Sequence, residues 1–246
     1  MEPIYTLKKT VTQEYLAPDG RASLWAMLRF AMDASGQHST RLSYDWDTLA
    51  QKGMFWAVVR HRMQVDRYPE EGEVITVETW PMPTTRTAFP RAAVGYDQQG
   101  KEIFRLVSLW VLIDIKLRKM ILPGKSGIQV EGFLRGNELE IPATISPQEL
   151  ENLTFRTVSP EDIDRNQHMN NARYLVWAQD LLPQEIRTQQ KPREFVVCYL
   201  SEARLGQELA LHWAWDPEGF LQVDGHRVQT VVPEKNTRIF ALKMFL

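Results

Sequence analysis

The chain contains one segment twice, and this repeat restricts the possible folds more than any other feature of the sequence. The first half contains VVRHRMQVDRYPEEGEVITVETW, and the second half contains VVCYLSEARLGQELALHWAW. Both segments begin with two valines, turn at a glycine and close with a strand-like run that ends in tryptophan. Aligning Val59 with Val197 places Gln64 opposite Glu202. A repeat of this kind predicts two structural copies that carry different polar residues.

Each half shows the same predicted order, a helix followed by strands. In the first half, an alternating run over residues 4–11 precedes apolar residues at helical spacing, which predict a helix over residues 23–35 closed by Gly36. A second short helix is expected to start at Asp47 and to stop before Gly53. Runs rich in strand-forming residues follow, separated by turn clusters, at residues 55–65, 74–80, 88–96 and 103–115.

In the second half, Asn170 is expected to cap a helix. Its apolar stripe consists of Tyr174, Ala178, Leu181 and Leu182. Strands are expected at residues 195–204, 208–215, 220–230 and 237–246. One long helix packed on a curved antiparallel sheet, formed twice, is an α+β architecture. The predicted boundaries are residues 1–130 for the first unit, 131–147 for a connection and 148–246 for the second unit.

Composition sets further limits. The 246 residues are enough for two domains, and 43% hydrophobic with 24% charged residues is typical of a globular protein. The net charge of -2 gives no overall attraction to nucleic acid or anionic lipid. The N-terminus MEPIYTLKKTVTQEY lacks the features of a signal peptide, and the most apolar run, VSLWVLIDI, is too short to span a bilayer. With one cysteine, Cys198, no internal disulfide can form, and a cytoplasmic protein is expected.

The stretch DIDRNQHMNN, residues 162–171, concentrates polar residues before the second predicted helix. Helix capping explains the trailing asparagines and leaves Asp164, Asn166 and His168 unexplained. In an extended segment these alternate residues point to one side, so they would present a carboxylate, an amide and an imidazole together. Backbone N–H groups at the start of the following helix would suit a developing oxyanion. The residues alone leave both interpretations open.

Metal binding fits this stretch poorly. Asp162, Asp164 and Asn166 occupy the first three ligand positions of a calcium loop, but Gln167 stands where that loop needs glycine. Arg173 stands where it needs a bidentate glutamate. The other histidines are scattered and the single cysteine is not at zinc-ligand spacing, so no metal site is expected.

The motif and three longer segments resemble the acyl-acyl carrier protein (acyl-ACP) thioesterases, bacterial and plant plastid enzymes that end fatty acid synthesis by hydrolysing the acyl thioester. The hallmark of that family is D-x-N-x-H followed by Asn-Asn and a helix, which appears here as DIDRNQHMNNARYLVW. FWAVVRHRMQVDRYPEEGEVITVETW, SLWVLIDIKLRKMILP and VVCYLSEARLGQEL also match. The resemblance therefore covers nearly the whole chain.

The resemblance implies a tandem (double) hotdog fold, in which the first hotdog supplies most of the acyl pocket and the second most of the catalytic residues. By motif, the catalytic set carries over to Asp164, Asn166, His168 and Glu202. Glu202, Asp164 or both would activate water, while Asn166 and His168 would polarise the thioester carbonyl. The position after Glu202 is often cysteine in the plant enzymes and is Ala203 here, so no cysteine nucleophile is expected. Neither a metal nor an organic cofactor is implied.

The expected acyl pocket would use large apolar residues of the first half, among which methionines adapt well to a flexible chain. They are Trp25, Met27, Leu28, Phe30, Met54 and Trp56. The implied partner is acyl carrier protein, an acidic protein that would meet a local basic surface. Two clusters could form that surface: Arg60, Arg62 and Arg67, or Lys116, Arg118 and Lys119. Neither nucleic acid nor a membrane is an expected partner, and a homodimer is left open.

Other functions remain compatible with the same residues. An acyl-CoA thioesterase of the same fold would hydrolyse CoA thioesters at least as well as carrier-protein thioesters. A hotdog dehydratase would act on a 3-hydroxyacyl thioester and release no free thiol. A non-catalytic acyl-binding or carrier-protein-binding hotdog protein would bind without hydrolysis.

Overall fold

The computed structural model describes residues 3–164, 167–189, 191–216, 219–228 and 237–246 of the chain. The chain divides into two compact units, Met1–Pro142 and Ala143–Leu246. Within the described residues, no helix combines the length and the hydropathy that crossing a membrane requires.

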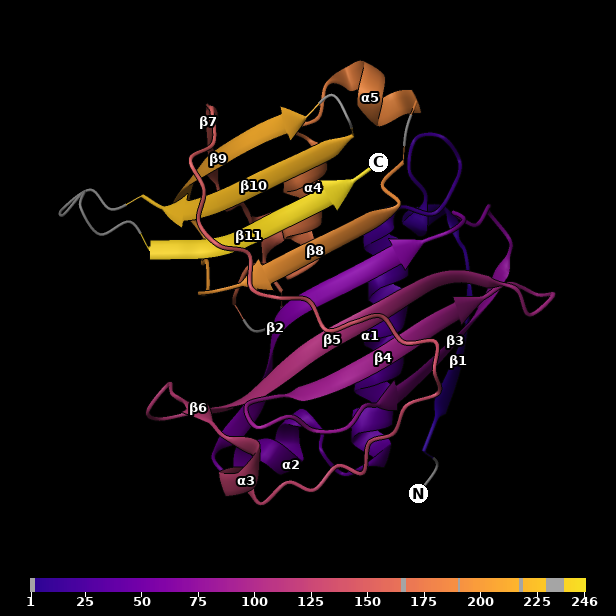
Figure 1. Cartoon of the computed structure of the whole chain (residues 1–246), viewed down its shortest axis with the longest axis vertical. Helices are drawn as coiled ribbons and strands as arrows, with labels where there is room; N and C mark the ends of the chain where they lie inside the picture. The colour runs from indigo at the N-terminus through magenta and orange to yellow at the C-terminus, as the bar shows by residue number, and fades with distance from the viewer. Residues whose placement is uncertain (1–2, 165–166, 190, 217–218, 229–236) are drawn as a thin grey trace. The chain divides into compact units, whose positions relative to one another are not determined.

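The first unit is a curved antiparallel sheet with a long helix along one face (Figure 1). Its elements are β1 (Tyr5–Thr10), the 3-10 turn η1 (Gln13–Tyr15), α1 (Leu24–Arg41), α2 (Trp46–Gln51), β2 (Met54–Val65), β3 (Val74–Pro81), β4 (Phe89–Tyr96), β5 (Glu102–Asp114), β6 (Met120–Ile121) and α3 (Pro123–Ser126). The strand order is β1-β3-β4-β5-β2, with β6 paired to β5. The predicted strands of this half are confirmed to within two residues, whereas β6 and α3 were not anticipated.

Helix α1 starts as expected but ends later. The Ser23 side chain caps it by accepting a hydrogen bond from the N–H of Ala26 at 3.1 Å. The prediction that Gly36 closes the helix is wrong, because α1 continues to Arg41. A glycine inside a helix costs only about 1 kcal/mol. The last turns recover this cost by packing, since His38 is buried and stacks on the ring of Tyr5.

Polar side chains are buried between α1 and the sheet. His61 on β2 is fully buried, and its Nδ1 lies 2.9 Å from the Oγ of Ser108 on β5. Arg91 on β4 places its Nη1 3.0 Å from Nδ1 of His38. Burial lowers the pKa of His61 to about 3, so this imidazole is neutral in the folded protein near neutral pH.

His61 is expected to make stability depend on pH in mild acid. The folded pKa is about 3 and the unfolded value about 6.5, so the unfolded chain binds the extra proton between these limits. The contribution of His61 to the free energy of unfolding is therefore fully present above about pH 6.5. Below that pH it decreases by about 1.4 kcal/mol per pH unit. Urea unfolding of the wild type and of His61→Gln from pH 7.5 to 5 measures the effect. Equal slopes in the two proteins would contradict the assignment.

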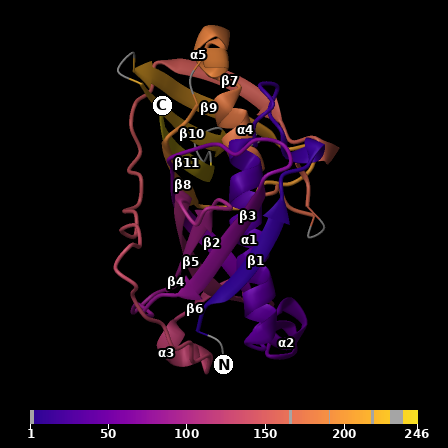
Figure 2. The ribbon, with the colours of Figure 1, turned by 90° about the vertical axis from the view of Figure 1, so that its right-hand side faces the viewer.

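The segment that leaves the first sheet runs back along the face opposite α1 (Figure 2). The N–H of Phe133 donates to the carbonyl of Pro81 at 3.1 Å, and the indole N–H of Trp80 donates to Glu138 at 3.0 Å. Gly132 is required for this approach, because a Cβ there would lie 2.0 Å from the carbonyl oxygen of Met82. The first part of the predicted connection, residues 131–142, is here called the strap. It covers the outer face of the first sheet.

The second unit has the same plan with a shorter helix. Its elements are β7 (Asn152–Thr157), the 3-10 turn η2 (Pro160–Asp162), α4 (Arg173–Gln179), α5 (Gln184–Gln189), β8 (Glu194–Tyr199), β9 (Glu208–Asp216), β10 (Phe220–Arg227) and β11 (Thr237–Phe245). The strand order β7-β9-β10-β11-β8 reproduces that of the first unit element by element. Helix α4 packs on this sheet through Tyr174, whose ring centroid lies 4.6 Å from that of Phe240. The predicted strand 195–204 ends early, at Tyr199, and the end of predicted strand 220–230 falls outside the described residues.

The duplication extends to details of the sheets. In the first unit Gly95 pairs with Phe104, and the Phe104 ring fills the space that a side chain at position 95 would take. The strand register shifts directly after this pair. In the second unit Gly225 pairs with Phe240 in the same way, again followed by a register shift. A Cβ on either glycine would lie about 2 Å from the phenyl ring, at 2.2 Å and 2.1 Å respectively. The predicted structural repeat is therefore confirmed.

The register of the repeat differs from the one that the paired valines indicated. After β2, the N–H groups of Asp66 and Arg67 both point to the carbonyl of Ile103. After β8, those of Leu200 and Ser201 both point to the carbonyl of Ile239. Asp66 therefore corresponds to Leu200 in the repeat. Two residues further along each unit, Tyr68 corresponds to Glu202. The alignment of Gln64 with Glu202 is wrong, because hydrogen bonds between strands set the register and the Val-Val pairs do not.

Candidate functional site

A buried carboxylate anchors the loop that carries the polar motif. Asp162 is 2% exposed, and one of its oxygens accepts hydrogen bonds from the N–H and hydroxyl of Ser159, at 3.0 and 2.8 Å. The other accepts from Nε of Arg173 at 2.7 Å and from the indole N–H of Trp177 at 3.1 Å. Burial by itself would raise the pKa of Asp162, but the donors of Ser159 and Arg173 outweigh it and hold the pKa below its usual value.

The described residues on either side of positions 165–166 present His168. The N–H of Asp164 donates to the carbonyl of His168 at 2.9 Å, and the N–H of Gln167 donates to the carbonyl of Asp164 at 3.0 Å. Gln167 has a φ of 64°, in the left-handed region. The Asp164 carboxylate accepts a hydrogen bond from the backbone N–H of His168 at 3.3 Å. Asp164 thereby holds the backbone of the residue whose imidazole it was expected to accompany.

Glu202 meets His168 from the loop after β8. The two loops are joined one residue beyond each functional side chain, where the N–H of Met169 donates to the carbonyl of Ala203 at 2.9 Å. Nε2 of His168 lies 3.2 Å from Oε2 of Glu202, and both side chains are part-exposed. Arg227, at the end of β10, donates to the carbonyl of Glu202. The backbone on each side of this carboxylate–imidazole pair is thus fixed.

The remaining predicted site residues are placed as follows. Asn166 lies outside the described residues. Asn170 accepts from the N–H of Ala172 at 2.9 Å, but it does not cap the helix, because α4 begins only at Arg173. Cys198 is fully buried on the sheet face that packs against Ile145, the face opposite α4. This position removes the sulfur from the loop that carries His168 and excludes it as a nucleophile there.

The first unit contains the same loop without the chemistry. The N–H of Ala17 donates to the carbonyl of Arg21 at 2.7 Å, as Asp164 does to His168. The N–H of Ala22 donates to the carbonyl of Pro69 at 2.7 Å, as Met169 does to Ala203.

These hydrogen bonds place Ala17, Arg21 and Tyr68 where the second unit has Asp164, His168 and Glu202. Tyr68 cannot replace a carboxylate base, since burial raises its pKa far above the ordinary value. One scaffold thus occurs twice, and only the second copy carries a carboxylate–imidazole pair.

Sequence reasoning missed the residues that hold the pair in place, Asp162, Arg173, Trp177 and Arg227. Asp162 had a detectable signal, because Ser159 stands three residues before it in the pattern of a capping box. Arg227 had none, since its contact with Glu202 joins segments 25 residues apart.

The six expected pocket residues all lie in the first unit. Met27, Leu28 and Phe30 are fully buried on α1, and Trp25 is partly exposed beside Tyr15 at a centroid distance of 6.3 Å. Met54 and Trp56, at the start of β2, belong to one apolar cluster that also contains Leu49, Phe89, Leu112 and Ile128. The ring of Trp56 meets that of Phe89 edge-on at 4.9 Å.

The second-unit arrangement suits proton transfer. A part-exposed carboxylate within hydrogen-bond distance of an imidazole is the pairing that general acid–base catalysis uses. Among the residues that the structure describes, no group of three or more His, Cys, Asp or Glu side chains is placed to hold a metal ion.

Two successive units of helix on curved antiparallel sheet define a double hotdog protein. The chain belongs to the acyl-ACP thioesterase family, whose N-terminal domain model matches residues 5–122 and whose C-terminal domain model matches residues 146–239. The boundary between these matches lies close to the boundary between the two compact units.

Solved structures and curated proteins agree with this placement. An acyl-ACP thioesterase from Bacteroides thetaiotaomicron superimposes with a TM-score of 0.88 at 23% identity, covering 99% of this chain and 97% of that one. The 12:0-ACP thioesterase from Umbellularia californica superimposes with a TM-score of 0.81 at 18% identity, covering 100% and 97%. At these identities the likeness establishes the fold.

Among curated proteins, a chloroplastic acyl-[acyl-carrier-protein] hydrolase, FATB3, from Cuphea viscosissima is 24% identical over 216 residues, 81% of this chain and 52% of that protein. A chloroplastic palmitoyl-acyl carrier protein thioesterase from Gossypium hirsutum is 28% identical over 146 residues, 55% and 35% of the two chains. The alignments therefore span about half or less of these relatives' own length.

Proposed function

We propose that this protein hydrolyses the thioester of fatty acyl-ACP, releasing a free fatty acid and ending fatty acid synthesis. The observation that carries the proposal is the 3.2 Å contact between Nε2 of His168, in the family motif, and Oε2 of Glu202, in a second matching segment. The same scaffold in the first unit lacks both residues, so the second unit would perform the chemistry.

In the proposed reaction, Glu202 acts as the general base. It takes a proton from a water molecule as the water oxygen attacks the thioester carbonyl carbon, a contribution on the order of 10² to 10⁴ in rate. The tetrahedral intermediate then expels the carrier's thiolate, which takes up the proton. The balance is one acyl thioester and one water converted to one fatty acid and one thiol.

We assign His168 to hold and orient Glu202. Its Nε2 lies 3.2 Å from Oε2 of Glu202, which supports this orienting role. Asn166 would hold the carbonyl oxygen, and one such donor contributes roughly 3–4 kcal/mol to transition-state binding. The first turn of α4 plays no part in this scheme, because the helix begins five residues after His168.

The fatty chain would lie in the first unit. The buried and half-buried apolar side chains of α1 and β2 are chemically suited to it. The cluster around Met54, Trp56 and Phe89 combines aromatic walls with an adaptable methionine.

A thiol-release assay tests the proposal. The protein is given acyl chains of several lengths on acyl carrier protein and on CoA, and free thiol is measured over time. We expect the higher kcat/KM on carrier-protein thioesters. Equal or better turnover of CoA thioesters would reassign the substrate, and binding of acyl-ACP without thiol release would rule out the hydrolase.

A further inference from the structure

The β5–β6 hairpin ends in six consecutive exposed residues, Ile115–Met120, here called the hairpin tip. They read IKLRKM and include no acidic residue. The apolar members are well exposed: Leu117 by 67%, Met120 by 49% and Ile115 by 37%. Large apolar side chains alternating with cations on one projecting turn are unusual on a surface that meets only water.

The hairpin tip is held in a defined conformation. The Asp114 carboxylate accepts hydrogen bonds from the N–H groups of Lys116 at 2.8 Å and Leu117 at 2.7 Å. The N–H of Ile115 donates to the carbonyl of Gly53 at 2.9 Å, which ties the tip to the turn before β2. The Asp114 carboxylate, next to the tip, is therefore used to shape the backbone of the turn.

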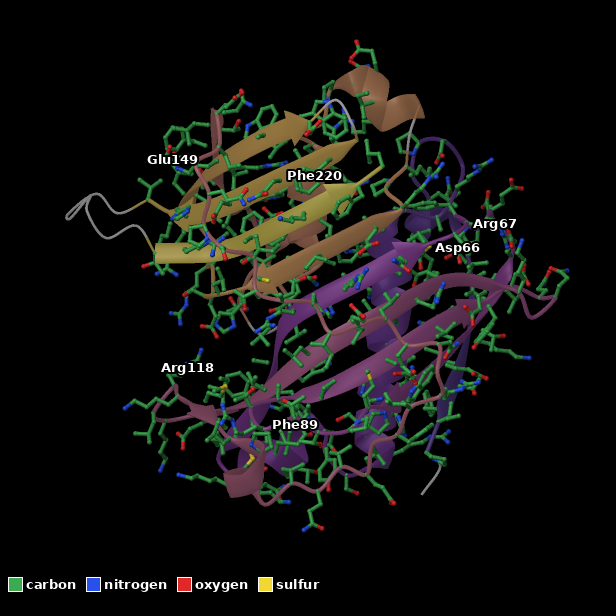
Figure 3. The ribbon with its side chains drawn as sticks, viewed as in Figure 1. Asp66, Arg67, Phe89, Arg118, Glu149 and Phe220 are labelled. Carbon is green, nitrogen blue, oxygen red and sulfur yellow. The ribbon has the colours of Figure 1, made fainter. Side chains whose placement is uncertain are left out.

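Aromatic residues extend the surface beyond the tip. The Arg118 guanidinium lies over the ring of Phe55 at 5.2 Å, and the Phe55 ring lies 5.5 Å from that of Trp46. Trp46, at the start of α2, is 52% exposed. Figure 3 shows Arg118 at the projecting end of the first unit. Exposed tryptophan and arginine are the residue types that dominate binding energy in protein interfaces.

The other basic cluster of the sequence is used within the fold. Arg60 donates to the carbonyl of Pro142 at 2.7 Å, on the strap. Arg67 makes a bidentate pair with Glu73, at 2.7 and 2.8 Å, and approaches Asp97 at 3.5 Å. These arginines stabilise the first unit and are poorly placed to recruit a partner.

We propose that the hairpin tip, together with Trp46 and Lys52, is the surface on which the acidic carrier protein docks. This inference rests on the proposed function. Lys52, Lys116, Arg118 and Lys119 are exposed cations, which complement a negative partner, and the apolar side chains between them fit a folded protein surface.

The triple variant K116E/R118E/K119E tests the docking surface. We expect its kcat/KM on acyl-ACP to fall about 10-fold or more, mainly through KM, and to lose most of its dependence on ionic strength. Turnover of the same acyl chain on pantetheine, which carries neither charge nor protein, should remain within about two-fold of wild type. Leu117→Ser should also raise KM for acyl-ACP alone.

The control variant K8E/R86E/K101E makes the same charge change at exposed positions elsewhere in the first unit and should keep wild-type kinetics on both substrates. Equal kinetics of the two triple variants on acyl-ACP would overturn the docking surface and leave the hydrolase intact. An equal loss on acyl-ACP and acyl-pantetheine would assign the tip to fold integrity, which thermal unfolding would register. Loss of binding to phosphatidylglycerol vesicles with unchanged acyl-ACP kinetics would assign it to lipid. A wild type inactive on every thioester would refute the proposed function itself.

Discussion

Replacing Glu202 with glutamine is expected to lower kcat on acyl-ACP by about 10² to 10⁴ while KM changes little. The amide keeps the size of the side chain and can still accept a hydrogen bond from His168, but it cannot take a proton from water. Because the backbone around residue 202 is held by Arg227 and by the Met169–Ala203 hydrogen bond, the fold should be unaffected. Single-turnover thiol release with saturating enzyme measures the chemical step directly.

Two further variants make this result specific. Asp164→Asn should reduce kcat less than Glu202→Gln, because its carboxylate contacts the backbone N–H of His168. Glu208→Gln changes an exposed carboxylate at the start of β9 and should have wild-type activity. If Glu202→Gln and Asp164→Asn both retain full turnover, the water-activation scheme is wrong. A larger loss for Asp164→Asn than for Glu202→Gln would transfer the base role to Asp164.

Replacing Asp162 with asparagine is expected to destabilise the second unit and to weaken catalysis together. One buried oxygen would become an amide nitrogen facing the donors of Ser159 or of Arg173 and Trp177, which already fill both sides. Losing these buried, charge-assisted hydrogen bonds is expected to lower the free energy of unfolding by on the order of 2–4 kcal/mol. The loss is smaller than for a fully buried ion pair, because Arg173 is partly exposed. Urea unfolding measures this loss, and kcat should fall as the turn carrying His168 loosens.

The pH dependence separates a charge effect from a packing effect. The pKa of Asp162 is lowered in the folded state, so its stabilisation is complete above the unfolded value of about 3.9 and disappears as pH falls below it. The difference in stability between wild type and Asp162→Asn should therefore shrink in acid. Asp180→Asn, which removes a carboxylate paired with Arg156 and Arg187 at the surface, should cost less than about 1 kcal/mol. A constant difference at all pH values would show that Asp162 acts through shape alone.

Local patterns predicted most of the secondary structure. Strands β2 to β5 were predicted to within two residues, because alternation and turn clusters are properties of neighbouring residues. The end of α1 was missed, since packing of His38 on Tyr5 involves a strand far from it in sequence. Helix α4 was predicted to start too early, because the residues after His168 form a turn in which Asn170 bonds to Ala172.

The sequence named the candidate site residues, and the structure adds the contacts that some of them make. The resemblance named Asp164, Asn166, His168 and Glu202, and it implied that His168 polarises the thioester carbonyl. In the structure, Nε2 of His168 lies 3.2 Å from Oε2 of Glu202. No sequence pattern could report this contact, because it depends on where two separate loops cross.

The sequence by itself determined that the chain is built twice on one plan and that the second copy carries the polar motif, since periodicity, turns and motifs are written in consecutive residues. Only the tertiary structure decided the register of the two copies, in which Glu202 corresponds to Tyr68. It alone decided that His168 faces Glu202 and that Arg60 and Arg67 serve the fold while the hairpin tip stays exposed. The physical reason is the same in each case. These outcomes depend on hydrogen bonds and packing between segments far apart in the chain, and such contacts form only when the sheet has brought the segments together.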